Sequence, residues 1–309
     1  MITPDPIKPG ATFAVISPAS APLPAKLERG LDYLHSKGFH IKEGRHLRGK
    51  HKYLSGHGPE QLADIHWAFE DDEVDAIICS RGGYGTPRFL DDLDFERIAQ
   101  HPKFVIGYSD ITALQWALAV ETGLVSISGV MAAVEMADPE GIDPFTEKVF
   151  WDLITKPMEG QILRNPAEMK HEIYSPGEAE GQLVGGCLSL FNNLMGTPYF
   201  PDMAGSILVL EDIGENAQHL DRMLSQFKMA GFFHGDQRIN GLMLGEFMGS
   251  WDAADPDDFL LEELVHDIIG KVDFPIVAGV AYGHGRRKLT LPLGAQVKLN
   301  GNDGSLTIL

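Results

Sequence analysis

Short apolar runs alternate with segments of helical periodicity through the first half of the chain. The runs are rich in β-branched residues and end at glycine or polar residues, which is typical of buried strands. Strands are expected over residues 12–16, 40–42, 74–79, 103–108 and 124–128, and helices over 27–38, 59–69, 109–121 and 144–154. This alternation predicts an α/β domain whose parallel sheet is covered on both faces and binds ligands at the carboxyl ends of its strands.

The pattern changes after residue 154, where loop-forming residues gather. Lys156 to Gly160 and Ser175 to Gly177 bracket an irregular stretch. We therefore expect an N-terminal α/β domain over residues 1–155, a linker over 156–177 and a smaller C-terminal α/β domain over 178–309. In the C-terminal domain, helices are expected over 187–194, 220–227 and 259–269, and strands over 207–210, 242–244 and 276–280.

Ser109 stands at a sharp predicted turn between a strand and a helix. Phe104 to Ile106 is the apolar strand, Gly107 ends it, and Leu114 and Leu118 recur at helical spacing behind it. Such a turn lifts a hydroxyl above the edge of a sheet, at the positive end of a helix, which suits a nucleophile. The alternative is that Ser109 only caps the helix, the usual role of serine at a helix start.

Two further polar residues follow apolar strands in the same way. Glu211 comes after residues 207–210, and His284 lies in a glycine-flanked turn after residues 276–280. A nucleophile, an imidazole base and an orienting carboxylate are what acyl transfer requires. Glu211 is also one of 44 acidic residues and His284 one of 12 histidines. Spacing alone therefore leaves a solvated acid and a turn histidine open as alternatives.

The consecutive glycines Gly82 and Gly83 follow the strand expected over residues 74–79. Backbone N–H groups in such a loop can point at one spot, so Gly83 would provide half of an oxyanion hole and the N–H of Asp110 the other half. The alternative is a tight turn that needs positive φ. A phosphate-binding loop is disfavoured, because neither a Gly-Lys-Ser/Thr sequence nor the GxGxxG spacing is present.

Composition restricts the partners that the protein can have. The 309 residues are 44% hydrophobic and carry 25 basic against 44 acidic side chains, a net charge of −19. So acidic a chain repels polyanions, so neither nucleic acid nor an anionic membrane is an expected partner. The two cysteines, Cys79 and Cys187, form no zinc-type cluster, and no metal is expected. No secretory signal or bilayer-length apolar run is visible, which favours a cytoplasmic setting.

Four motifs together resemble the serine LD-carboxypeptidase family. They are Ser-Arg-Gly-Gly-Tyr-Gly at 80–85, Gly-Tyr-Ser-Asp-Ile-Thr-Ala-Leu at 107–114, Leu-Glu-Asp-Ile-Gly-Glu at 210–215 and Gly-His-Gly at 283–285. The resemblance covers nearly the whole chain. It implies an N-terminal domain similar to class I glutamine amidotransferases, with Ser109 as nucleophile and the N–H groups of Gly83 and Asp110 as oxyanion hole. Glu211 and His284 would complete the triad from the C-terminal domain. Residues 107–111 lack the GxSxG pattern of ordinary α/β-hydrolases.

The resemblance also implies a reaction. Family members cleave an amide between an L-centre and a D-amino acid, typically releasing terminal D-alanine from cytoplasmic murein tetrapeptide, without a cofactor or metal. A homodimer is implied as well. Beside what the resemblance implies, Arg81 is a candidate to hold the terminal carboxylate and Glu246 a substrate amine, although a surface or loop charge is the more common role for each.

Two alternatives to the murein reaction stay open. A related branch, similar to microcin-immunity proteins, cleaves peptidyl-aminoacyl nucleotides and usually carries a polar Asn/Ser-rich stretch after the glycine pair. Residues 85–89 here, Gly-Thr-Pro-Arg-Phe, resemble the murein-acting branch instead. The second alternative is a non-catalytic binder of small ligands built on the same two α/β domains. The presence of a candidate nucleophile and base disfavours it.

Overall fold

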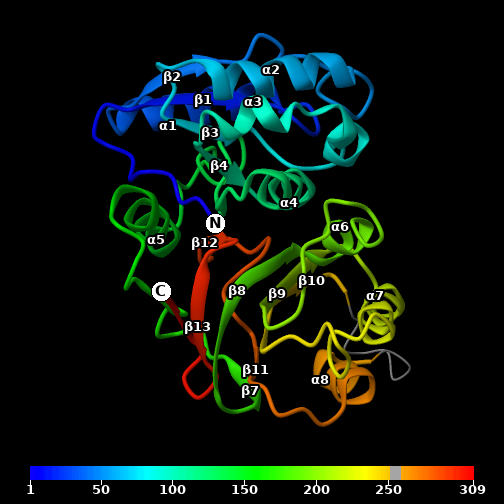
Figure 1. The fold of residues 1–309 in the computed structure, drawn as a ribbon. Helices are drawn as coiled ribbons and strands as arrows, with labels where there is room; N and C mark the ends of the chain where they lie inside the picture. Colours follow the sequence, from blue (N-terminus) through cyan, green and yellow to red (C-terminus); the bar gives the residue numbers. More distant parts are fainter. Residues whose placement is uncertain (251–258) are drawn as a thin grey trace. The chain divides into compact units, whose positions relative to one another are not determined.

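The structure is a computed structural model that describes residues 1–250 and 259–309. It contains two compact units, which are considered separately (Figure 1). The first unit comprises Met1–Met158, Gly196–Phe200 and Thr290–Gly294, and the second comprises Glu159–Met195, Pro201–Leu289 and Ala295–Leu309. Both units combine a sheet with helices, which confirms the predicted α/β class.

The first unit contains the parallel sheet that the apolar runs predict. Its strand order is β12-β5-β4-β3-β1-β2, and all neighbours are parallel except β12 with β5. The strands are β1 (Thr12–Ile16), β2 (His40–Glu43), β3 (Ala76–Cys79), β4 (Phe104–Gly107), β5 (Ser126–Ser128) and β12 (Leu291–Leu293). The strand order reverses between β1 and β3. The loops after these two strands therefore flank the point where such sheets bind ligands.

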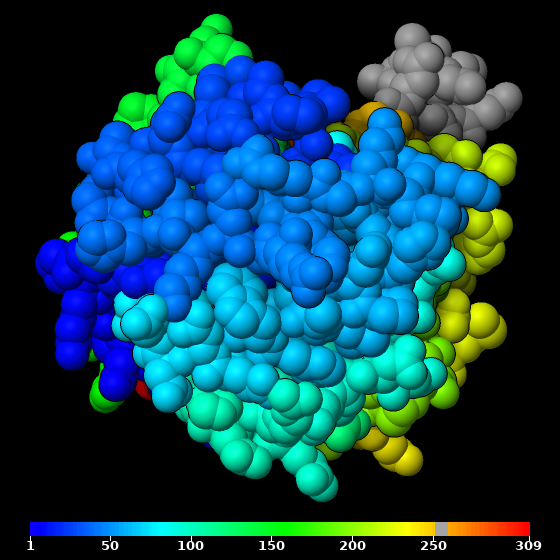
Figure 2. Space-filling model, turned by 90° about the horizontal axis from the view of Figure 1, so that it is seen from above, coloured from blue at the N-terminus to red at the C-terminus, as the bar shows by residue number. Residues whose placement is uncertain are grey.

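The helices of the first unit lie along this sheet, and the blue to cyan segments of this unit form most of the face seen in Figure 2. They are α1 (Pro24–Ser36), α2 (Gly58–Glu70), α3 (Phe95–Ala99), α4 (Ile111–Thr122) and α5 (Pro144–Thr155), with 3₁₀ turns η1 (Thr86–Arg88) and η2 (Leu90–Asp92). Trp151 of α5 stacks on Tyr33 of α1 and meets Phe13 of β1 edge-on. These aromatic contacts anchor two helices to one side of β1.

The second unit has a mixed sheet with strand order β6-β14-β13-β8-β9-β10-β11-β7. The strands are β6 (Ile162–Leu163), β7 (Glu172–Ser175), β8 (Glu178–Cys187), β9 (Ile207–Ile213), β10 (Gly241–Met248), β11 (Ile276–Ala278), β13 (Gln296–Asn300) and β14 (Ser305–Ile308). The run β8-β9-β10-β11 is parallel, and the outer strands are antiparallel. Parallel strands again place their carboxyl ends at one edge, and β9 and β10 carry Glu211 and Glu246 near those ends.

The helices of the second unit are α6 (Leu188–Asn193), α7 (Ala217–Met229), α8 (Leu261–Leu264) and a π-helical turn η3 (Val265–Ile269). The helix expected from residue 187 begins one residue later, because Cys187 is still paired with Glu211 in the sheet. The helix expected from Phe259 begins at Leu261, where Glu263 accepts a hydrogen bond from the N–H of Leu260. No helix among residues 1–250 and 259–309 is long and apolar enough to span a bilayer.

Candidate active site

Ser109 occupies a strained turn between β4 and α4. Its φ is +63°, a left-handed value that only Lys52 shares among the described non-glycine residues. Bulky or branched residues avoid this region, and such strain collects at functional sites. The N-cap position of α4 belongs to Asp110, so Ser109 is not the capping residue. A Cβ on Gly107 would lie 3.0 Å from the Ile111 side chain, so this turn requires glycine where the strand ends.

The glycine loop lies against the nucleophile candidate inside the first unit. A Cβ on Gly82 would lie 3.0 Å from Cβ of Ser109 and 3.2 Å from its Oγ. Gly83 has a φ of +112°, and a Cβ there would meet Ser20 Oγ at 2.4 Å. Ser20 Oγ accepts the N–H of Tyr84 at 3.2 Å. The glycines thus form the tight turn with positive φ that was the alternative interpretation. The same turn places the backbone of the loop beside the hydroxyl of Ser109.

Glu211 and His284 meet in the second unit. His284 Nδ1 lies 2.7 Å from Glu211 Oε2, with side-chain exposures of 14% and 1% respectively. Glu211 lies within β9 rather than after the strand, because its backbone still pairs with Cys187 of β8. Gly283 has a φ of +137°, and a Cβ there would stand 3.0 Å from Glu211 Oε2. Glycine at 283 therefore permits the close approach of the histidine loop to the carboxylate.

The electrostatics of this pair suit an imidazole base. Burial raises the pKa of Glu211, and the hydrogen bond from His284 works in the opposite direction. Because a carboxylate only accepts, His284 carries its proton on Nδ1 and presents Nε2 as the basic nitrogen. Glu211 Oε1 is buried and has no hydrogen-bond partner in the described part of the chain. The carboxylate is thus committed to the imidazole.

Arg81 lies beside the glycine loop. Its Nε donates to the carbonyl of Gly82 at 3.3 Å, and its Nη2 lies 3.7 Å from where a Cβ on Gly83 would stand. The side chain is half-buried. A guanidinium held at this place offers further donors to an anionic group near the serine.

Glu246 stands at an irregularity of β10, where the register with β9 shifts between Leu244 and Phe247. Its N–H donates to the carbonyl of Tyr282 at 2.8 Å, and its carboxylate bonds the backbone of Gly285. Burial raises the pKa of Glu246. These bonds hold the carboxylate next to the loop that carries the histidine.

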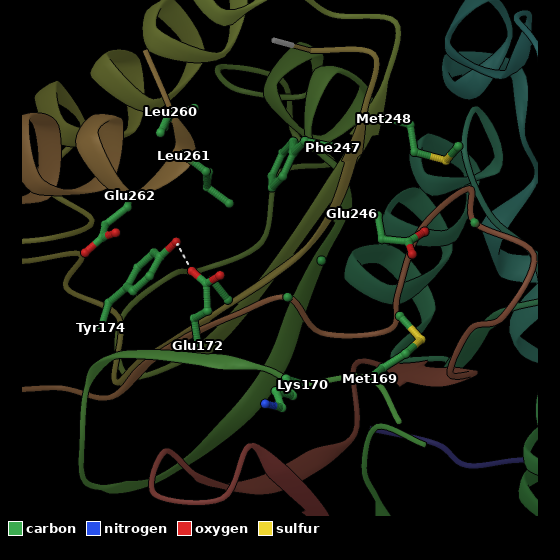
Figure 3. A pocket seen from close by; sticks show the side chains of 14 residues that line it. Met169, Lys170, Glu172, Tyr174, Glu246, Phe247, Met248, Leu260, Leu261 and Glu262 are labelled. Carbon is green, nitrogen blue, oxygen red and sulfur yellow. Dashed lines mark hydrogen bonds between the residues drawn. The ribbon is translucent and has the colours of Figure 1, made fainter. Parts of the chain in front are cut away.

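A cavity of about 610 Å³ opens beside Glu246 within the second unit. In Figure 3, Glu246 lies on one side of it and the hydrogen-bonded pair Glu172 and Tyr174 on the other, with Glu262 nearby. Phe247 and Leu261 supply apolar wall between them. The lining therefore combines apolar surface with three carboxylates against one ammonium, that of Lys170, and this excess of negative charge favours an aliphatic group ending in a cation.

Comparison with known proteins identifies the family. Residues 13–129 match the LD-carboxypeptidase N-terminal domain, and residues 180–299 match the LD-carboxypeptidase C-terminal domain. The chain belongs to the LD-carboxypeptidase family. It is therefore a serine-type carboxypeptidase, as the motifs predict. The chain is 36% identical over 297 residues to the probable murein peptide carboxypeptidase of Bacillus subtilis (strain 168), covering 96% of this chain and 91% of that protein.

Solved structures of the family share the fold. The muramoyltetrapeptide carboxypeptidase of Oxalobacter formigenes is 29% identical, with a TM-score of 0.82, over 96% of this chain and 97% of that chain. MccF in complex with glutamyl sulfamoyl guanosine is 22% identical, with a TM-score of 0.90, over 99% of this chain and 97% of that chain. At 22% identity the second likeness concerns the fold alone. The predicted two-part α/β architecture of this LD-carboxypeptidase family member is thus confirmed.

The structure gathers the candidate residues in two groups. Ser109, Gly83, Asp110 and Arg81 lie together in the first unit, through the contacts of the glycine loop. In the second unit, the Gly283–Gly285 loop brings His284 to Glu211 and Glu246. Sequence reasoning missed Thr86, whose contacts with Asp110 cross 24 positions of the chain. No local pattern marks such a residue.

Proposed function

We propose that this LD-carboxypeptidase releases the terminal D-alanine of murein tetrapeptide through an acyl-enzyme. The observation that carries the proposal is the hydrogen bond of 2.7 Å between His284 and the buried Glu211. A solvated acid and a turn histidine have no reason to pair in this way. The strained φ of Ser109 supports a nucleophile in the same family context.

The proposed reaction begins at the hydroxyl of Ser109. His284 Nε2 accepts its proton as Oγ attacks the carbonyl carbon of the L-centre, and Glu211 stabilises the imidazolium that forms. The N–H groups of Gly83 and Asp110 bind the oxyanion of the tetrahedral intermediate. Collapse of the intermediate breaks the C–N bond, and His284 returns the proton to the departing D-alanine amine. Water, activated by the same imidazole, then hydrolyses the ester.

Two side chains would bind the ends of the substrate. Arg81, beside the glycine loop, would pair with the terminal carboxylate of the D-amino acid. Glu246 would bind an ammonium of the acyl part, and the adjoining cavity, lined by Phe247 and Leu261, would cover its methylene groups. The charge of Arg81 tests its proposed role. Arg81→Glu, which reverses the charge, should raise KM far more than Arg81→Lys, which keeps it.

Peptidyl-aminoacyl nucleotides are the second candidate substrate, because the chain is also 26% identical over 320 residues to the microcin C7 self-immunity protein MccF of Escherichia coli. The decisive experiment incubates the full protein with the L,D-tetrapeptide, its all-L counterpart and an aspartyl-sulfamoyl nucleoside, followed by mass spectrometry. D-alanine release from the first peptide alone supports the murein reaction. Cleavage of the aspartyl-sulfamoyl nucleoside alone would replace the murein reaction with the nucleotide reaction. Tight binding without any turnover would favour a non-catalytic binder.

The setting proposed for this reaction is the cytoplasm, where murein peptides are recycled, and the proposed assembly is a homodimer. Both follow from the family resemblance. Sedimentation equilibrium across the micromolar range tests the dimer, because a monomeric mass at all concentrations would exclude it. Fractionation of cells tests the location.

A further inference from the structure

Thr86 and Asp110 connect the glycine loop to the nucleophile turn within the first unit. The N–H of Thr86 donates to Asp110 Oδ2 at 2.9 Å, and Thr86 Oγ1 donates to the backbone carbonyl of Asp110 at 2.6 Å. Thr86 follows the loop that contains Gly83, and Asp110 follows Ser109. The two bonds therefore join the segments that carry both proposed oxyanion-hole N–H groups.

Both residues of this connection are completely buried. Hydrogen bonds shielded from water are strong, and an unmade bond at such a site is costly, so each partner holds the other in place. The Asp110 side chain bonds the loop and makes no capping bond, although Asp110 occupies the N-cap position of α4. A side chain placed to stabilise the helix alone would bond the first-turn N–H groups instead.

Such a connection matters for catalysis because oxyanion stabilisation depends on donors fixed before the reaction. Gly83 and Gly85 both have positive φ, of +112° and +149°, a conformation that glycine adopts readily. Because glycine also adopts many other conformations, these residues do not by themselves fix the path of the loop. Something other than local side-chain sterics must hold the spacing between the N–H groups of Gly83 and Asp110.

We propose that the Thr86 hydroxyl and the Asp110 carboxylate form a clamp that fixes this spacing, making both side chains positioning residues for the transition state. The inference rests on the proposed function, in which those N–H groups bind the oxyanion. It assigns Asp110 a second role, carried by its side chain, beside the backbone role. Because the oxyanion exists only after attack, loss of the clamp lowers kcat and leaves substrate binding nearly unchanged.

The test compares Thr86→Val, which keeps the side-chain volume and loses the hydroxyl, with Thr86→Ser, which keeps the hydroxyl. Each full-length protein is assayed for kcat and KM on the L,D-tetrapeptide and for the rate at which a fluorophosphonate labels Ser109. We expect Thr86→Val to lower kcat and the labelling rate by about 10- to 100-fold. KM should change by less than about 3-fold, and Thr86→Ser should stay near the wild type.

The matched control is Thr146→Val, which removes the hydroxyl of an equally buried threonine in α5. Its melting temperature can fall, but its kcat should stay at the wild-type value. If Thr86→Val does not fold, Thr86→Ala against Thr86→Ser isolates the hydroxyl in the same way. A folded Thr86→Val with wild-type kcat and labelling overturns the clamp.

Failure of the proposed function gives a different result. A wild type that is neither labelled at Ser109 nor active on the tetrapeptide overturns the nucleophile and the clamp together. A wild type that is labelled but inactive on the tetrapeptide overturns only the substrate, and the labelling rates of the Thr86 variants then decide on the clamp.

Discussion

The two units hold their candidate catalytic groups by different means. In the first unit, the position of Ser109 is set by backbone: a positive φ, a glycine loop packed against its Oγ, and a strand and helix joined by a short turn. In the second unit, the position of His284 is set by a side chain, the carboxylate of Glu211, which is buried in a central strand. Backbone strain fixes the first group, and a charge-assisted hydrogen bond fixes the second.

This difference has a chemical reason. A nucleophile must approach the carbonyl along one path, so a rigid turn serves it best. A base must carry a proton between two partners and change its charge, so a buried carboxylate that stabilises the charged form serves it better. Changes to the backbone near Ser109 should therefore alter geometry, whereas changes near His284 should alter electrostatics as well.

The largest effect is expected from Ser109→Ala. Removing the only proposed nucleophile should lower kcat by about 10⁴-fold or more, as in other triads. The variant should still fold, because alanine also lacks a bulky side chain in this turn. Circular dichroism checks the fold, and D-alanine release checks the rate. Near-wild-type turnover in a sequence-verified variant would remove Ser109 from the mechanism.

The next effect concerns whether the two units share one step. His284→Ala should cost about as much as Ser109→Ala, and the double variant should be little worse than either, because the residues act as one unit. Rates are measured on the L,D-tetrapeptide at saturating concentration. Losses that multiply in the double variant would mean that the serine and the histidine act in separate steps.

A smaller effect is expected from Gly283→Ala, which tests the histidine side of the comparison. The added Cβ would stand 3.0 Å from Glu211 Oε2 at a residue with φ of +137°, so the His284–Glu211 bond should be displaced. A displacement of this size should lower kcat by about 10²-fold. Gly177→Ala is the control, because Gly177 has nearly the same φ, +133°, and the nearest atom to its Cβ position is 3.8 Å away. Equal kcat in both variants would assign the loss to backbone strain alone.

The sequence predicted most of the framework that carries these groups. Apolar runs located the parallel strands of the first unit, since a strand buried on both faces is nearly continuous in Val, Ile and Ala. The whole of β8 was missed, because Glu178–Cys187 contains three glycines and begins with alternating acids. The extension of β9 through Glu211 was missed because a charged residue in a central strand is unusual without a partner such as His284.

The site was predicted in part. Strand-end position and motif resemblance singled out Ser109, Glu211 and His284, whose catalytic roles stay predictions until the variants above are measured. The domain limits 1–155, 156–177 and 178–309 likewise stay a prediction. Thr86 escaped notice, because its bonds to Asp110 depend on the path of two loops in space. Pairing within β-sheets and between loops is long-range, so a linear pattern cannot specify it.

The smallest effect is on stability, and it tests whether the buried carboxylate is held at a cost. Burial raises the pKa of Glu211 above its model-peptide value of 4.5, so its contribution to folding is most favourable below that pH. The contribution is lost as the pH rises through the folded-state pKa, because the unfolded chain then ionises more readily.

Glu211→Gln removes this ionisation. Its melting temperature relative to the wild type should therefore increase as the pH rises above about 4.5, by about 2–4 °C for each kcal/mol relieved. Its kcat should nevertheless fall by about 10⁴-fold, since glutamine cannot stabilise the imidazolium. Calorimetry at matched ionic strength measures the difference, with Glu159→Gln, a substitution at an exposed glutamate, as the control. If the melting temperature of Glu211→Gln relative to the wild type instead decreases with rising pH, ionised Glu211 stabilises the fold. The buried carboxylate that positions His284 would then not lower the stability of the second unit.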